Sequence, residues 1–212
     1  MERQARELGL GIAVTANVLL LRASPMAPLE TRTEVLRRGS RAGVVETSLF
    51  ATGKLVAKGT ASFVTPLAVE GVPAAPPRPY DPSALPQWRR ARHFDHPTLF
   101  DAQDIRDDGQ GTKWGRLIRP LVSFPAPVAH VFAIADNATV FALTAKRIPL
   151  RWSFPNIDIS IHLSRPPVGA WIGVEPESDW RSEGMGYTET RLYDTQGWLG
   201  RACQAVVLTP LG

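Results

Sequence analysis

Several features that define common protein classes are scarce or absent in the sequence. Cys203 is the only cysteine among 212 residues, which excludes an internal disulfide and a cysteine-based metal site. No Gly-rich phosphate loop and no Gly-x-Ser-x-Gly motif occurs, so kinases, Rossmann enzymes and α/β-hydrolases are poor matches. The excess of basic residues is small, 24 Lys and Arg against 20 Asp and Glu, and these residues are scattered. This pattern argues against a nucleic-acid partner.

The start of the chain also lacks a targeting or membrane segment. The apolar run over 12–21 is interrupted by Thr15 and Asn17 and is too short to span a bilayer as a helix. The first residues, MERQARELG, are charged where a signal peptide would be apolar. With 44% hydrophobic and 21% charged residues, the composition is that of an ordinary folded protein. We therefore expect a cytoplasmic protein without a membrane partner.

The sequence does contain one pattern twice. VVETSLFATGKLVAKGTASFVTP, residues 44–66, is matched by YTETRLYDTQGWLGRACQAVVLTP, residues 187–210. The two align with a one-residue gap in the turn before Gly53 and Gly197, where an insertion disturbs a hairpin least. Each copy places a glycine between two runs rich in Val, Leu, Thr and aromatic residues, which is typical of a β-hairpin. We interpret the match as an internal duplication.

A proline-rich segment separates the two copies. Residues 67–112 carry a large share of the 19 prolines and show little periodic pattern, which indicates a linker. We therefore predict a first repeat over 1–66, a linker over 67–112 and a second repeat over 113–212.

Both repeats show the same order of predicted strands. In the second, an apolar stretch over 125–145 has helical length and begins with prolines that a helix start tolerates. Because this helix is apolar nearly all round, it must be buried. Four strands follow it, over 156–163, 169–177, 186–195 and 198–209. The first repeat predicts strands over 11–22, 28–37, 43–52 and 54–65, preceded by only about ten residues. We expect an α+β fold of two antiparallel sheets, each wrapped around a central helix, with the first helix shortened.

Two stretches of the second repeat resemble a known family. FPNIDISIHLSRPPVGAWIGVEPES and GMGYTETRLYDTQGWLGRACQAVVL are similar to the C-terminal half of the thioesterase-like superfamily, the double hotdog proteins related to acyl-CoA thioesterase II. The resemblance covers both repeats and is most specific over 132–208. It implies two hotdog units fused in one chain, which hydrolyse acyl-CoA to the fatty acid and free CoA. Hotdog sheets pair edge to edge or face to face, which leaves a homo-oligomer open.

The resemblance also implies a site. In acyl-CoA thioesterase II, an Asp on the second central helix, a Ser or Thr before the next strand and a Gln in the last strand hold the attacking water. The matching positions here are Asp136, Asn156 and Gln204. Asn156 departs from the family pattern, although an amide still donates to and accepts from a water. Thr60 takes the Gln204 position in the first repeat, so we expect one site per chain.

Each candidate also has an ordinary structural interpretation. Asp136 is costly to bury without a partner, but with Asn137 it can instead break the helix as a cap or turn. Asn156 begins a strand whose polar face carries Asp158, Ser160 and His162. Gln204 is the one polar side chain on its strand face, where it can bond the backbone as core glutamines do. We expect the other residues of that face to be Trp198, Gly200, Ala202, Val206 and Leu208.

Other residues are weaker candidates. Arg165 suits a CoA phosphate, against the alternative of an exposed arginine at a strand end. Trp171, with Trp180 and Trp198, is a candidate wall of an acyl tunnel or an ordinary core residue. His93 and His96 lie in the linker without a convergent third ligand. We therefore expect no metal and no cofactor.

Two functions remain after these considerations. The first is an acyl-CoA thioesterase that binds acyl-CoA and attacks its carbonyl with a water held by Asp136 and Gln204, assisted by Asn156. The second is a non-catalytic acyl-CoA or acyl-chain binding protein of the same fold, which the shortened first helix favours.

Overall fold

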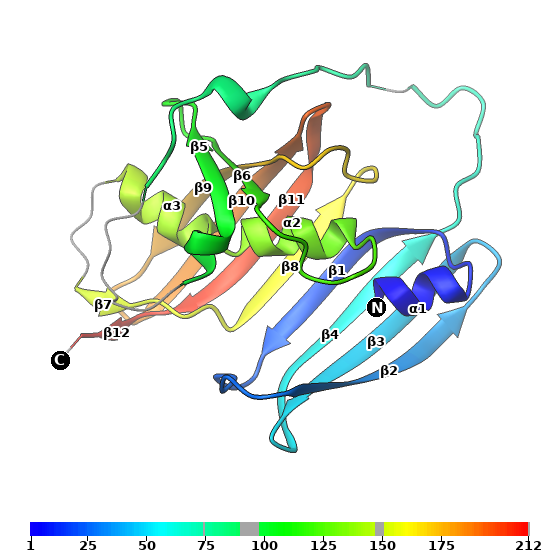
Figure 1. The fold of residues 1–212 in the computed structure, drawn as a ribbon, viewed down its shortest axis with the longest axis horizontal. Helices are drawn as coiled ribbons and strands as arrows, with labels where there is room; N and C mark the ends of the chain where they lie inside the picture. Colours follow the sequence, from blue (N-terminus) through cyan, green and yellow to red (C-terminus); the bar gives the residue numbers. More distant parts are fainter. Residues whose placement is uncertain (74, 90–97, 147–150, 212) are drawn as a thin grey trace.

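Ten strands form one continuous antiparallel sheet that curves around a bent central helix (Figure 1). The computed structural model describes residues 1–73, 75–89, 98–146 and 151–211. The strand order is β2-β3-β4-β1-β8-β11-β10-β9-β6-β5, and β12 pairs with β7 in a small separate ladder. The two predicted sheets are therefore joined edge to edge, because β1 pairs with β8.

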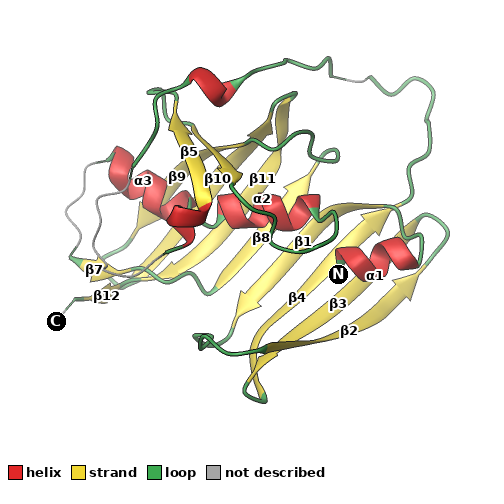
Figure 2. Cartoon of the chain, in the orientation of Figure 1, coloured by secondary structure: helices red, strands yellow, loops and turns green. Residues whose placement is uncertain are grey.

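The first unit consists of four strands and one short helix. Its elements are α1 (Glu2–Glu7), β1 (Ile12–Leu20), β2 (Leu29–Arg38), β3 (Ala42–Ala51) and β4 (Lys54–Val64). The four strands confirm the predicted ones within two residues at each end. Figure 2 shows that α1 is the one helix on this half of the sheet, where it packs with Ala5 and Leu10 buried. Most of β2 is exposed as an edge strand.

The segment between the repeats contains more structure than a linker. It holds the 3-10 turns η1 (Pro82–Ala84) and η2 (Leu99–Ala102) and the strand β5 (Gln103–Asp107), which pairs with β6 (Lys113–Leu117). The backbone N–H of Arg78 and that of Tyr80 donate to Gln196 and Thr195, in the turn after β10. Strand β5 thus forms one edge of the sheet. Alternation did not reveal β5 because it has only five residues.

The second unit has the long apolar helix and four long strands. The helical stretch is divided into α2 (Pro127–Ala135) and α3 (Ala138–Ala145). After it come β7 (Trp152–Ser153), β8 (Asp158–Leu163), β9 (Ile172–Trp180), β10 (Met185–Asp194), β11 (Gly197–Val207) and β12 (Thr209–Pro210). The stretch Pro127–Ala145 has a mean hydropathy of 1.4 and meets the length of a membrane span, but Val131, Ile134, Ala135 and Ala138 are fully buried inside the fold.

The two units present the same strands in mirrored order across the β1–β8 junction. The hairpins β3–β4 and β10–β11 have an identical register, in which the pair Glu46–Thr60 corresponds to Glu189–Cys203, 143 positions further along. Both hairpins bulge at the same place, at Val56 and Leu199. No gap is needed between them, so the one-residue gap predicted from the glycines is wrong. The glycine lies one position later in the second turn.

The bulge also changes which face Trp198 occupies. It inserts Leu199 on the inner side of β11, so Leu199 is fully buried and Trp198 is 52% exposed. Trp198 was expected to share the face of Gln204, and the bulge reverses that prediction because it shifts the alternation by one residue. Ala202, Gln204 and Val206 lie inside as expected.

Candidate active site

The helix breaks at the aspartate that the sequence singles out. Asp136 ends α2 and Asn137 begins α3. The amide Nδ2 of Asn137 donates to the backbone carbonyls of Ala133 and Ile134 and, at 2.8 Å, to Oε1 of Gln103 on β5. Gln103 in turn donates to the Ala133 carbonyl at 3.1 Å. The break is therefore stabilised by two buried amides that satisfy carbonyls at the end of α2.

Asp136 meets Asn156 across this break. Nδ2 of Asn156 donates to Oδ1 of Asp136 at 2.9 Å, and an isolated bridge to Val206 of β11 fixes the backbone of Asn156. Among the described residues, Oδ2 of Asp136 has no hydrogen-bond partner. The structure thus brings two of the three predicted residues into direct contact and leaves one carboxylate oxygen available.

The surroundings of Asp136 favour its protonated form. Although Asp136 is an exposed residue, the protein packed around its carboxyl desolvates it and raises its pKa above the ordinary value of 3.8, and the Asn156 hydrogen bond partly opposes this. Desolvation destabilises a charged carboxylate. A carboxylate of raised pKa is a stronger base than an ordinary aspartate.

Gln204 reaches the site through the helix backbone. It is 1% exposed, and its Nε2 donates to the carbonyl of Ala135 at 2.8 Å, one residue before Asp136. Its Oε1 accepts from the hydroxyl of Thr139 at 3.2 Å. Gln204 therefore bonds the backbone where the helix bends, as the ordinary interpretation of a core glutamine expects, and its role in holding a water stays a prediction.

A row of buried hydroxyls extends from Gln204 across the sheet. Thr139 also bonds Thr188 at 3.1 Å, and Thr188 bonds Ser178 at 2.7 Å. Thr188 and Ser178 lie beside Gln204 on the neighbouring strands β10 and β9. We did not single out these hydroxyls from the sequence, although polar residues at inward positions of adjacent strands are a signal that could have found them.

The first unit lacks these groups. By the shared register, Ala13 and Ala61 take the places of Asn156 and Gln204. The prediction that Thr60 occupies the Gln204 position is therefore wrong, because it depended on the misplaced gap. Both alanines are buried, so in the described part of the chain this arrangement occurs in the second unit.

Arg165 and Trp171 have other contacts in the structure. Arg165 forms a bidentate ion pair with the fully buried Asp194, with Nη2 2.6 Å from Oδ1, and this bonding raises the pKa of the guanidinium. Asp194 also accepts from the backbone N–H of Val168 and of Gln196. Trp171 is 7% exposed and lies under the guanidinium of Arg116. Their assignment to the substrate stays a prediction, and the structure brings neither into contact with Asp136.

The described histidines lie outside any cluster of potential metal ligands. His93 and His96 lie outside the described residues. Within the described ranges, no group of three or more potential metal ligands occurs. His130 is half-buried on α2, and loss of solvent lowers its pKa.

The family can be assigned from the match of a sequence model. The model of the acyl-CoA thioesterase C-terminal domain matches residues 67–208, which include α2, α3, Asp136, Asn156 and Gln204. The chain belongs to this family. A search of curated proteins found no match.

Several solved structures have the same fold. A putative thioesterase from Novosphingobium aromaticivorans has a TM-score of 0.72 at 17% identity, covering 98% of this chain and 83% of that one. An acyl-CoA thioesterase II from Mycobacterium marinum has a TM-score of 0.67 at 17% identity, covering 95% and 82%. A hot dog protein from Alicyclobacillus acidocaldarius has 0.71 at 16%, covering 96% and 81%. The double hotdog prediction is confirmed.

Proposed function

We propose that the protein hydrolyses acyl-CoA thioesters to the free acid and CoA with a water held at Asp136. The hydrogen bond from Asn156 to Asp136 Oδ1 carries this proposal, because it orients the carboxylate and leaves Oδ2 directed to another partner. Membership of the thioesterase family supplies the class of substrate.

The chemistry follows from these two groups. Oδ2 of Asp136 takes a proton from the water as its oxygen attacks the thioester carbonyl carbon. The tetrahedral intermediate then collapses, the carbon–sulfur bond breaks, and Asp136 returns the proton to the departing sulfur. The raised pKa of Asp136 favours the first transfer, because a carboxylate of higher pKa is a stronger base toward the attacking water.

Gln204 acts as a positioning residue in this scheme. It holds the Ala135 carbonyl and thereby the bend from which Asp136 projects. Asn156 takes the part that a Ser or Thr has in the family pattern, since its amide bonds the carboxylate.

A thiol-release assay with short, medium and long acyl-CoA thioesters tests the proposal. We expect Asp136→Asn to lower kcat by about 10²-fold or more, as general-base catalysis contributes 10²–10⁴-fold. Asn156→Ala should also lower kcat, and Asn156→Ser should restore much of the activity because a hydroxyl still donates to Asp136.

The binding-protein alternative predicts a different result. If the wild type releases no thiol from any thioester while acyl-CoA raises its Tm, the proposed hydrolysis is wrong and the protein is an acyl-CoA binding protein. If Asp136→Asn hydrolyses as fast as the wild type, the proposed water site is wrong. Exposed Arg41→Ala, in the first unit, serves as the control and should match the wild type.

A further inference from the structure

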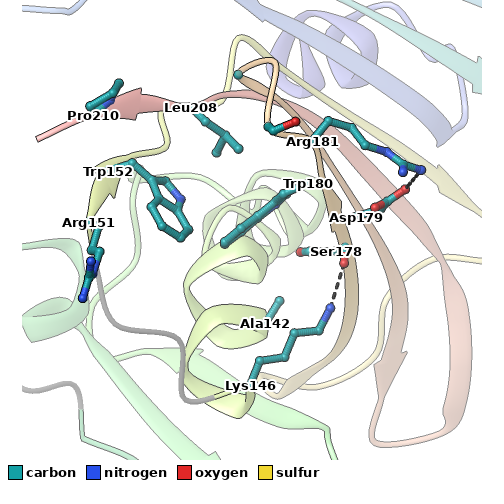
Figure 3. A pocket seen from close by; sticks show the side chains of 12 residues that line it. Ala142, Lys146, Arg151, Trp152, Ser178, Asp179, Trp180, Arg181, Leu208 and Pro210 are labelled. Atoms are coloured by element: carbon teal, nitrogen blue, oxygen red, sulfur yellow. Dashed lines mark hydrogen bonds and ion pairs between the residues drawn. The ribbon is translucent and has the colours of Figure 1, made fainter.

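A cavity at the far end of α3 from Asp136 carries an unusual set of donors. It has a volume of about 570 Å³ and is lined by Lys146, Arg151, Arg181, Trp152 and Trp180, among others (Figure 3). None of the residues assigned to catalysis lines it. The positive charges of this cavity are therefore not accounted for by the proposed hydrolysis.

Two cations in the cavity lack a carboxylate partner among the described residues. Arg181 is paired with Asp179 at 2.6 Å, but Lys146 donates only to the neutral backbone carbonyl of Ser178 at 2.8 Å. Arg151 forms no side-chain hydrogen bond or ion pair with any described residue. The cavity thus has an excess of positive charge, and charge-assisted bonds to an anion are roughly twice as strong as neutral ones.

The aromatic wall adds two more donors without acceptors. Trp152 and Trp180 meet edge to face, with ring centroids 6.0 Å apart at 87°. The Nε1 atoms of both indoles are buried and have no hydrogen-bond acceptor in the described structure. Buried donors are nearly always satisfied. Two cations without a carboxylate partner among the described residues, beside an aromatic wall, point to an anionic occupant with a flat or apolar part.

Three segments of the chain connect the cavity with the candidate site: helix α3, the residues before β8 and the end of β11. Asp136 lies just before α3, and Ala142 and Lys146, further along this helix, line the cavity. Trp152 lies four residues before Asn156, and the cavity residue Leu208 lies four residues after Gln204. Four residues of extended chain span about 13 Å, a distance that a medium-length acyl chain or the pantetheine arm of CoA can bridge.

We propose that this cavity binds an anionic group of the thioester substrate, through Lys146 and Arg151, with the indole wall contacting the adjoining flat or apolar portion. The anion is either a carboxylate at the distal end of the acyl group or a phosphate of the CoA nucleotide. This inference depends on the proposed function for the identity of the ligand, but it concerns binding and not hydrolysis.

Four non-hydrolysable thioethers distinguish the two sources. S-hexyl-CoA and S-(5-carboxypentyl)-CoA carry the phosphates, and the corresponding pantetheine thioethers lack the nucleotide and its phosphates. Calorimetric Kd values are measured for the wild type, for Lys146→Met with Arg151→Met, and for Arg41→Ala as the exposed control. The near-isosteric methionines keep the apolar stems and remove the charges.

We expect the double variant to weaken binding of the anionic ligands by about tenfold or more, because the charge-assisted hydrogen bonds to the anion are lost. A loss confined to both carboxypentyl ligands identifies the acyl carboxylate, and a loss confined to both CoA ligands identifies the nucleotide phosphates. Arg151→Lys with Lys146 intact should retain most of the affinity. S-hexyl-pantetheine, which carries neither anion, should bind equally well to wild type and variant.

Other outcomes overturn the inference. It fails if the double variant leaves every Kd unchanged, if it weakens S-hexyl-pantetheine as much as the charged ligands, or if no thioether binds. Failure of the proposed function looks different, because a protein that hydrolyses nothing can still show charge-dependent thioether binding. Conversely, active enzyme with unaltered affinities would leave the water site standing and remove the anion subsite.

Discussion

At the scale of single residues, the position of Asp136 opposes the stability of the folded protein. Its carboxyl has a raised pKa in the fold because desolvation disfavours the charge. The folded state therefore releases this proton at higher pH than the unfolded chain does. As pH rises above the ordinary value of 3.8 and through the folded pKa, the ionised group progressively destabilises the fold, and above the folded pKa the penalty is constant.

Asp136→Asn should consequently stabilise the protein at pH 7 while it abolishes the proposed hydrolysis. The substituted amide still accepts from Asn156 through its oxygen, so the contact is retained. Urea denaturation at pH 7 and at pH 4 measures the effect, and the gain should be larger at pH 7. A variant less stable than wild type at pH 7 would show that Asp136 is satisfied as a carboxylate.

The sequence could identify residues that local patterns mark, but not contacts between residues that are far apart in the chain. Asp136 and Asn156 stand out because each is a polar residue next to an apolar segment, and the family pattern pairs them. Arg165 was chosen for the same kind of reason, but its partner Asp194 lies 29 positions away, and no local pattern reveals that buried ion pair. The face of Trp198 was predicted wrongly because the sequence does not reveal the bulge that shifts the alternation of β11 by one residue.

At the scale of elements, the bend between α2 and α3 depends on a residue from a distant strand. Asn137 and Gln103 are 4% and 6% exposed, and together they satisfy the carbonyls of Ala133 and Ile134. The sequence indicated a break at 136–137 only as the alternative to a site role for Asp136. It did not indicate Gln103, because that residue belongs to the proline-rich segment interpreted as a linker.

Asn137→Ala should lower the free energy of unfolding by about 1–3 kcal/mol, the usual effect of leaving buried polar groups without partners. It should also lower hydrolysis, because alanine favours a continuous helix and Asp136 would lose its position. Chemical denaturation and the thiol-release assay measure the two effects. Thr144→Ala, on the exposed end of α3, is the matched control. Equal stabilities of the two variants would show that the amide pair does not hold the bend.

At the scale of the whole molecule, the single sheet predicts that the two units unfold together. All six tryptophans lie at or after residue 88, so their fluorescence reports on the second unit and its adjoining segment. Far-ultraviolet circular dichroism reports on both units. We expect the two probes to give the same midpoint in urea, since β1 and β8 share one ladder and a common core crosses it.

Separate midpoints would contradict this prediction and would mean that the units unfold independently. The substitution Ala16→Pro provides a stringent check, because Ala16 pairs with Ala61 on one side and Ile161 on the other and proline removes a ladder donor. It should lower both midpoints together.

The pairing of β1 with β8 is symmetric about one pair of residues. Asn17 and Ser160 face each other there, their side chains are 2.6 Å apart, and Ser160 lies 143 positions after Asn17, so these two are each other's counterparts. The two halves are arranged like two identical subunits around a two-fold axis, but both belong to one polypeptide. In a dimer of identical chains, every substitution is made twice. Because the two halves here are encoded separately in one chain, one half can carry Asn156 and Gln204 while the other carries Ala13 and Ala61. The covalent link also keeps the two halves together at any protein concentration.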